Sequence, residues 1–234
     1  MKKPEYSIVV PVYNQLESTK KCLASIIQQS YNYNYELIVV ANGCNDGTES
    51  WVLNTISNAY PNVVLVSYSY PLGGGEAINV GLRLCKGEYN ITLNNDCIVL
   101  NSNWIEMLRE PFANPATGRT GITGPLELFS PETNDTFIVF FCTMIRREVI
   151  QNIGLLDTDT FQTGYGEDMD FCKRAKLAGW EIAKVPNQEL TPGEGMWTGD
   201  FPIYHAGEVT VHTLPDWNEI IERNKKLLRE RYGT

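Results

Sequence analysis

Several features that would assign a function directly are scarce in this sequence. Its 234 residues contain two histidines, and its six cysteines are scattered without a Cys-x-x-Cys pair, so reduced, mostly structural thiols are expected. No run approaches the roughly 20 apolar residues that a membrane helix needs, and the polar start of the chain does not resemble a signal peptide. We therefore expect an intracellular, cytoplasmic protein.

An excess of basic charge is also lacking. The formal net charge is −9, which argues against broad electrostatic binding to nucleic acid because that binding needs a basic face. With 43% apolar and 20% charged residues, the composition is that of a soluble globular protein rather than a disordered one. The length suits one sizeable domain, so we expect a single domain over residues 1–234.

The first hundred residues alternate short, β-branched apolar runs with stretches of helical periodicity. We expect strands over residues 7–12, 35–40, 63–68 and 89–93, with helices over 16–29, from about 48 and from about 77. Pro11 cannot donate to a ladder and should end the first strand, whereas Ser18 or Thr19 should cap the first helix. These strand–helix units predict an α/β fold with a mainly parallel central sheet flanked by helices.

A polar triplet, Asn94-Asn95-Asp96, interrupts the apolar stretch over residues 89–100. In open α/β sheets ligands collect beyond the carboxyl ends of the strands, where a carboxylate can bind a divalent cation that also takes phosphate oxygens. Asn and Asp are equally good turn residues. Taken alone, the triplet favours a hairpin turn over a metal-bound phosphate.

The loops after the second and third strands are rich in small or polar residues. Residues 41–48 form either a turn with Asp46 or Thr48 as the helix cap, or a nucleoside pocket at a strand's carboxyl end. Three glycines at 73–75 allow a backbone to approach a ligand closely, before a helix N-terminus that favours an anion. This run matches neither a Walker loop nor Gly-x-Gly-x-x-Gly, so it is a weak signal by itself.

The second half has a different pattern. We expect short helices over 103–109 and from 146 to about 154, strands over 120–125 and 182–185, and one long, nearly continuous apolar strand over 136–145. Glu167, Asp168 and Asp170 open a helix that Gly179 closes. Acids in a first turn complement the helix dipole, but a carboxylate at such a loop-to-helix junction can also serve as a general base.

The end of the chain contributes an irregular segment, both histidines and a helix. Residues 187–202 are rich in glycine and form either a lid that closes on substrate or a surface loop. His205 and His212 follow, and a solitary histidine is more often structural than a ligand. Residues 217–232 predict a charged amphipathic helix, for which packing or partner contact is a better explanation than membrane binding.

Taken together, seven motifs in this order resemble family 2 glycosyltransferases with the GT-A fold. They are SIVVPVYN (7–14), ELIVVANGCNDGT (36–48), GGGEAINVGL (73–82), LNNDC (93–97), MIRRE with GLLD (144–157), GYGEDMDFCKR (164–174) and IYHAG (203–207). Each motif is common by itself, but seven in register are hard to obtain by chance. The resemblance runs over about residues 7–210.

The resemblance implies roles for particular residues. Asp96 would be the last acid of the family's Asp-x-Asp motif and coordinate Mn²⁺ or Mg²⁺ on the donor diphosphate, with His205 as a further metal ligand. Asp168 would be the catalytic base, with Glu167 beside it. The nucleotide side would be lined by Pro11, Val12, Tyr13, Asn42, Gly74, Gly75, Asn79, Asn94 and Asn95.

Two positions depart from the family pattern. Asn94 replaces the first acid of the metal motif, which leaves one carboxylate there and makes a weaker or dispensable metal plausible. Ala41 stands where members that bind uridine often have an acid, so uracil is recognised otherwise or the donor base is different.

The resemblance implies an inverting enzyme that moves a sugar from a nucleotide-diphosphate donor to a hydroxyl of a glycan, lipid-linked or protein acceptor. About residues 1–100 would bind the nucleotide sugar and about 101–214 the acceptor, with a C-terminal helix over 215–234. Acceptor choice is expected to depend on residues 126–136 and 157–166. Such an enzyme is compatible with peripheral contact with a membrane.

Three other functions fit the same composition. A nucleotidyltransferase that forms sugar nucleotides is disfavoured, because no Gly-rich segment with a following basic residue lies near the N-terminus. A non-catalytic nucleotide-sugar or carbohydrate-binding module is compatible with the weakened metal motif. A structural interaction protein would leave the acids at 167–170 and His205 without a reason to converge on one cleft.

Overall fold

The protein is described here by a computed structural model. It describes residues 2–113, 118–162, 164–185, 191–193, 196–198, 200–207 and 216–233, with only the backbone for 191–193 and 196–198.

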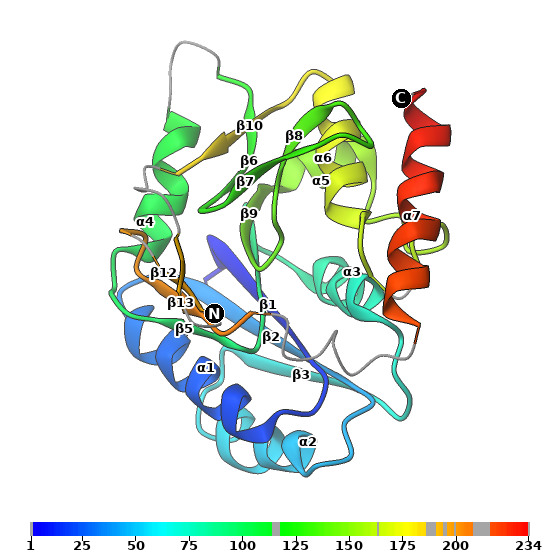
Figure 1. Cartoon of the computed structure of the whole chain (residues 1–234). Helices are drawn as coiled ribbons and strands as arrows, with labels where there is room; N and C mark the ends of the chain where they lie inside the picture. Colours follow the sequence, from blue (N-terminus) through cyan, green and yellow to red (C-terminus); the bar gives the residue numbers. More distant parts are fainter. Residues whose placement is uncertain are drawn as a thin grey trace.

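A seven-stranded sheet with the order β10-β6-β9-β4-β1-β2-β3 forms the centre of the molecule (Figure 1). Its strands are β1 (Tyr6–Val12), β2 (Tyr35–Asn42), β3 (Val63–Tyr68), β4 (Tyr89–Leu93), β6 (Thr120–Gly124), β9 (Cys142–Arg146) and β10 (Glu181–Lys184). The pairs β4-β1, β1-β2, β2-β3 and β10-β6 are parallel, whereas β9 runs antiparallel to both of its neighbours. The predicted mainly parallel α/β fold is confirmed.

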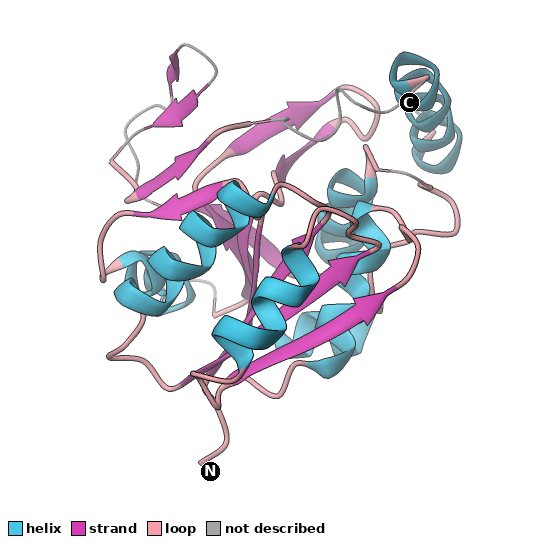
Figure 2. Ribbon diagram, turned by 90° about the horizontal axis from the view of Figure 1, so that it is seen from below, coloured by secondary structure: helices cyan, strands magenta, loops and turns pink. Residues whose placement is uncertain are grey.

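Helices cover both faces of this sheet (Figure 2). They are α1 (Leu16–Gln29), α2 (Thr48–Trp51) with a π-helical continuation (Val52–Ser57), α3 (Gly74–Leu84), α4 (Trp104–Arg109) with a 3₁₀ turn (Glu110–Ala113), α5 (Arg147–Ile153), α6 (Glu167–Leu177) and α7 (Trp217–Tyr232). Successive side chains of a strand point to opposite faces. Accordingly Ile8 and Val10 of β1 pack in one core with α1 and α4, and Val9 packs in a second core with α3 and α6.

Two smaller sheets complete the fold. One is antiparallel, with the order β11-β12-β13-β5, and consists of β11 (Thr191–Gly193), β12 (Met196–Thr198), β13 (Ile203–His205) and β5 (Cys97–Val99). The other is a hairpin of β7 (Glu127–Ser130) and β8 (Asp135–Ile138). The segment 187–202, expected to be irregular, thus contains two short strands where it is described. Part of the proposed lid lies outside the described residues, and so does His212.

One strand prediction is wrong. Residues 136–145 do not form a single strand, because β8 pairs with β7 whereas β9 belongs to the central sheet. A turn at 139–141 separates them. Its Phe140 and Phe141 rings are buried in different cores. Because the apolar run continues through the turn, hydrophobic periodicity does not reveal that the chain turns here.

One local prediction is confirmed and another changes. β1 ends at Val12, directly after Pro11, as expected, and its pairing with β4 has already ended at Val9. The helix α1 begins at Leu16, so neither Ser18 nor Thr19 is its cap. Among the described helices, none is long and apolar enough to cross a membrane.

Candidate functional site

The candidate site lies where β5 and β13 pair beyond the carboxyl end of β4. Asp96 directly precedes β5, and His205 ends β13 opposite Cys97. The Ala206 N–H donates to the Asp96 carbonyl at 3.2 Å, which fixes the two strands at this point. As a result the His205 Nε2 and Asp96 Oδ1 atoms, far apart in the chain, lie 3.2 Å from each other.

This pair fits a divalent cation. Asp96 Oδ1 and His205 Nε2 are both buried, and neither has a hydrogen-bond partner among the described residues. Such atoms are costly to leave unsatisfied, and a carboxylate oxygen with an imidazole nitrogen suits Mn²⁺ or Mg²⁺. The Phe141 ring stacks on the imidazole at 4.4 Å between centroids, which fixes its orientation.

Cys97 offers a third donor close to the pair. Its Sγ lies within 4.8 Å of the Asp96 and His205 donor atoms. Burial, followed by the charge of Asp96, raises the pKa of the Cys97 thiol well above its usual range. A protonated thiol is a poor metal ligand, so oxygen and nitrogen define the chemistry of this site.

The polar triplet forms the predicted turn and places Asp96 beside His205, whereas its binding of a metal-bound phosphate stays a prediction. The Cys97 N–H donates to the Asn94 carbonyl at 3.2 Å, which closes a tight turn between β4 and β5. The Asn95 side chain donates to Thr19 Oγ1 at 3.0 Å and so holds this turn against α1. The turn presents the third member, Asp96, to His205.

A second group of carboxylates opens α6. Burial raises the pKa of Asp168 to about 6, although backbone hydrogen bonds from Met169, Asp168 itself and Phe140 oppose the shift. The Met169 N–H donates to Asp168 Oδ1 at 2.9 Å. The Phe140 backbone thus bonds to Asp168, and the ring of the next residue, Phe141, stacks on His205. The turn 139–141 therefore connects the Asp96–His205 pair to Asp168.

Glu167 is the more strongly perturbed of the two acids. Burial, and then the charge of Asp168, raises its pKa to about 8. Its Oε2 atom is buried without a hydrogen-bond partner among the described residues. A Cβ built on Gly75 would lie 3.4 Å from Glu167 Oε1 and 2.9 Å from Thr158 Cγ2. The glycine run therefore lies against the acidic cluster, and a side chain at Gly75 would displace it.

Replacing Glu167 with glutamine should stabilise the protein at high pH. The folded state holds this proton more tightly than the unfolded chain, whose pKa is near 4.5, so the wild type should lose stability as the pH rises through about 8. Melting curves of wild type and Glu167→Gln should agree at pH 4, below the unfolded pKa, and at pH 9 the variant should melt several degrees higher. Glu148→Gln, on the exposed surface of α5, is the control. Equal melting temperatures at pH 9 would contradict the shift.

Three of the predicted nucleotide-side residues, Asn42, Asn79 and Asn95, already have protein partners for their side-chain amides. The Asn42 amide donates to the Gly73 carbonyl at 3.3 Å and accepts the Leu72 N–H at 2.7 Å. Asn79 exchanges two hydrogen bonds with the Leu156 backbone, at 2.9 and 3.0 Å. These amides hold loops in place.

Gly74, another predicted residue on this side, leaves room for a ligand. Outside its own helix and chain neighbours, no heavy atom of the described residues lies within 4 Å of a Cβ built on Gly74. Pro11 and Tyr13 are partly exposed, whereas Val12 is buried. The role of each in binding a nucleotide stays a prediction.

Sequence reasoning missed the contribution of α7. Its Asn224, in the middle of a charged helix, is fully buried. The Asn224 amide donates to the Gly164 and Tyr165 carbonyls at 2.9 and 2.8 Å, in the loop that leads to Glu167. Asp170, which follows Glu167 and Asp168 in the first turn of α6, differs from them because it is paired with Arg174 and Arg231. The polar positions of α7 carry no periodic signal that would reveal these contacts.

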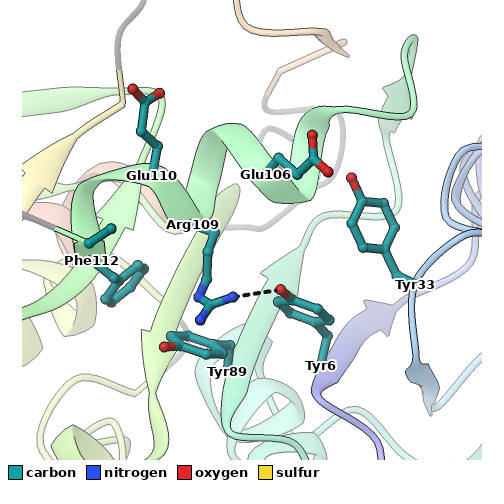
Figure 3. A pocket seen from close by; sticks show the side chains of 8 residues that line it. Tyr6, Tyr33, Tyr89, Glu106, Arg109, Glu110 and Phe112 are labelled. Carbon is teal, nitrogen blue, oxygen red and sulfur yellow. Dashed lines mark hydrogen bonds between the residues drawn. The ribbon is translucent and has the colours of Figure 1, made fainter.

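A separate pocket of about 410 Å³ lies at the opposite, amino ends of β1 and β4 (Figure 3). Arg109 donates to Tyr6 Oη at 3.1 Å, lies over the Tyr89 ring, and pairs with Glu5. Its charge is therefore satisfied within the protein. None of the predicted site residues lines this pocket.

The family model and the relatives that this chain resembles are all glycosyltransferases. Residues 7–122 match the model of glycosyl transferase family 2. Glycosyltransferase AglE of Haloferax volcanii is 27% identical over 200 residues, which cover 76% of this chain and 64% of that protein. Poly(ribitol-phosphate) beta-glucosyltransferase of Bacillus spizizenii is 29% identical over 142 residues, 57% of this chain and 22% of that protein. The chain thus spans under two thirds of the length of these relatives.

A solved structure supports the fold. Mannosyltransferase PcManGT from Pyrobaculum calidifontis, in complex with GDP-Man and Mn²⁺, superposes with a TM-score of 0.65 at 19% identity and covers 83% of this chain and 59% of that one. The likeness extends beyond the segment matched by the family model. The chain belongs to glycosyl transferase family 2 and has the GT-A fold.

Proposed function

We propose that the chain is an inverting glycosyltransferase that moves a sugar from a nucleotide-diphosphate donor to a hydroxyl of a glycan, lipid-linked or protein acceptor. One observation carries the proposal: a single turn, 139–141, connects the buried Asp96–His205 pair to the carboxylate of Asp168. Sugar transfer needs a group that stabilises the leaving diphosphate and a base for the acceptor hydroxyl. The two groups supply these functions.

Asp96 and His205 would hold Mn²⁺ or Mg²⁺ on the donor diphosphate. The bound cation supplies Lewis-acid stabilisation of the charge on the leaving phosphate. With one carboxylate in this pair, the protein offers little charge of its own, so we expect weak binding of the cation in the absence of a nucleotide.

Asp168 would accept the proton of the acceptor hydroxyl as the new bond forms. A base near pKa 6 is largely ionised at neutral pH and remains basic enough to take a proton. A single in-line displacement inverts the anomeric carbon. Glu167, with its higher pKa, would stay protonated at neutral pH and donate a hydrogen bond to a substrate hydroxyl.

The donor base would be recognised without a carboxylate on β2. Ala41 is buried inside this strand. The nearby Asp46 carboxylate already accepts the Leu16 and Thr48 N–H groups at 3.0 and 3.1 Å. Backbone groups and amides around the ends of β1 and β2 would therefore contact the base. We further propose a cytoplasmic enzyme, with peripheral contact to a membrane if its acceptor is lipid-linked.

The proposal is tested by donor hydrolysis without acceptor, using uridine, thymidine and guanosine diphosphate sugars with Mn²⁺ or a chelator. One donor should be hydrolysed in a metal-dependent way, and Asp96→Ala should lower the rate by about 10²-fold or more. Glu148→Ala, which removes an exposed carboxylate on α5, should behave like wild type. The anomeric configuration of a transfer product, read by NMR, tests inversion.

The alternative function, a non-catalytic nucleotide-sugar or carbohydrate-binding module, predicts a different outcome. Calorimetry would then detect binding of a nucleotide sugar or a glycan, while no donor is turned over with either metal. If no member of the panel is bound or hydrolysed, the transferase proposal is wrong.

A further inference from the structure

Two aromatic side chains, those of Tyr165 and Trp217, lie near the acidic cluster at the start of α6. Tyr165 lies two residues before Glu167, and Trp217 is the first residue of α7. Their rings meet edge to face, with 6.5 Å between centroids and an interplanar angle of 82°. Both side chains are partly exposed, so their surface remains available to a ligand.

Trp217 and Glu167 converge on one point. A Cβ built on Gly164 would lie 3.7 Å from Glu167 Oε1 and 3.9 Å from two carbons of the Trp217 ring. The aromatic surface and the carboxyl group therefore border the same space. Asp168 follows Glu167 in the first turn of α6.

The backbone that presents Tyr165 is unusual and firmly held. Gly164, Tyr165 and Gly166 have φ values of 108°, 69° and 99°, and a left-handed conformation is costly for a residue as bulky as tyrosine. The buried Asn224 amide of α7 donates to the Gly164 and Tyr165 carbonyls. The contact fixes this costly conformation beside the acids, where strain is most often retained for function.

We propose that Tyr165 and Trp217 form a binding platform for a sugar ring of the acceptor, so that the acceptor is a glycan. The inference rests on the proposed function, because it places the attacking hydroxyl between this platform and Asp168. Partly exposed aromatic rings beside a few polar groups suit a ligand with both apolar and hydroxyl-bearing surfaces. A pyranose ring has an apolar C–H face for the rings and hydroxyls for Glu167 and Asp168. The side chain of a serine or threonine has no such face.

The test compares three acceptor classes with the donor identified above. The probes are methyl pyranosides of glucose, galactose, mannose and N-acetylglucosamine, a peptide containing serine and threonine, and a long-chain isoprenyl phosphate. A pyranoside should accept the sugar. Trp217→Ala should raise the KM for that pyranoside about tenfold, while the Kd for the donor changes less than twofold.

Two further variants control the result. Trp217→Leu keeps apolar volume without a ring and should raise KM as Trp217→Ala does, which separates loss of stacking from a packing defect. Trp180→Phe changes a tryptophan that packs against Arg119 and donates to Asn152, and should leave KM unchanged. Transfer only to the peptide or the isoprenyl phosphate, or an unchanged KM in both Trp217 variants, would overturn the proposal.

A failure of the proposed function is distinguishable from a failure of the platform. If wild type neither binds nor hydrolyses a nucleotide sugar, the transferase assignment fails first. Saturation-transfer NMR of the same methyl pyranosides then tests the platform alone. Binding by wild type that is lost in Trp217→Leu supports it, and the absence of binding refutes it.

Discussion

Replacing Asp168 with asparagine should lower the rate of sugar transfer by about 10²–10⁴-fold, the usual contribution of a general base. An amide has nearly the same shape, and its oxygen can still accept the Met169 N–H, but it cannot take a proton. The Kd for the donor should change little, because the donor diphosphate is proposed to lie at Asp96. The rates are measured with saturating donor and acceptor.

The pH dependence of the wild type gives an independent test. Below its pKa of about 6, Asp168 is protonated and cannot serve as a base, so the rate should rise with pH through this value and then level off. Asp135→Asn is a suitable control, because this carboxylate pairs with Lys173 and Lys176 of the same helix. A flat profile between pH 5 and 7, or near-normal transfer by Asp168→Asn, would rule out this role for Asp168.

Replacing Asp170 with alanine should destabilise the protein by about 3 kcal/mol, because it removes a buried carboxylate that pairs with two partly exposed arginines. Asp170 is fully buried. It accepts hydrogen bonds from Arg174 at 2.7 Å, from Arg231 at 2.7 Å and from the Tyr232 hydroxyl at 2.6 Å. The residue therefore holds α7 against α6.

Urea unfolding, followed by circular dichroism, measures this change. The control is Asp135→Ala, which removes a partly exposed carboxylate beside the same helix and should cost about 1 kcal/mol or less. If the two variants lose equal stability, the Asp170 network does not contribute as a buried ion pair. Far-UV spectra before unfolding check that both variants retain the native fold.

Much of the sheet could be predicted because its signals are local. The runs that become β1, β2 and β3 are short, rich in β-branched residues and bounded by turn residues, and each precedes a helical pattern. The run over residues 136–145 misled the same reasoning. Phe140 and Phe141 each find a separate buried environment, so polarity does not change where the chain turns.

The site was predicted by residue type and order, but its contacts were not. A motif indicates that Asp96 and His205 belong together, whereas the pairing of β5 with β13 explains how they meet. Asn42 and Asn79 read as nucleotide ligands in the sequence, yet both hold loops through backbone hydrogen bonds. The buried Asn224 shows why such roles escape prediction, because its partners are the carbonyls of a distant loop.

The turn at 139–141 has a consequence for how chain length can vary in this fold. The Phe141 carbonyl accepts the Asn94 N–H at 2.9 Å, its ring stacks on His205, and the preceding Phe140 backbone bonds to Asp168. One inserted or deleted residue there would change the distance from His205 to Asp168, since no other part of the turn could absorb it. Insertions and deletions among homologous chains should therefore be absent from 139–141.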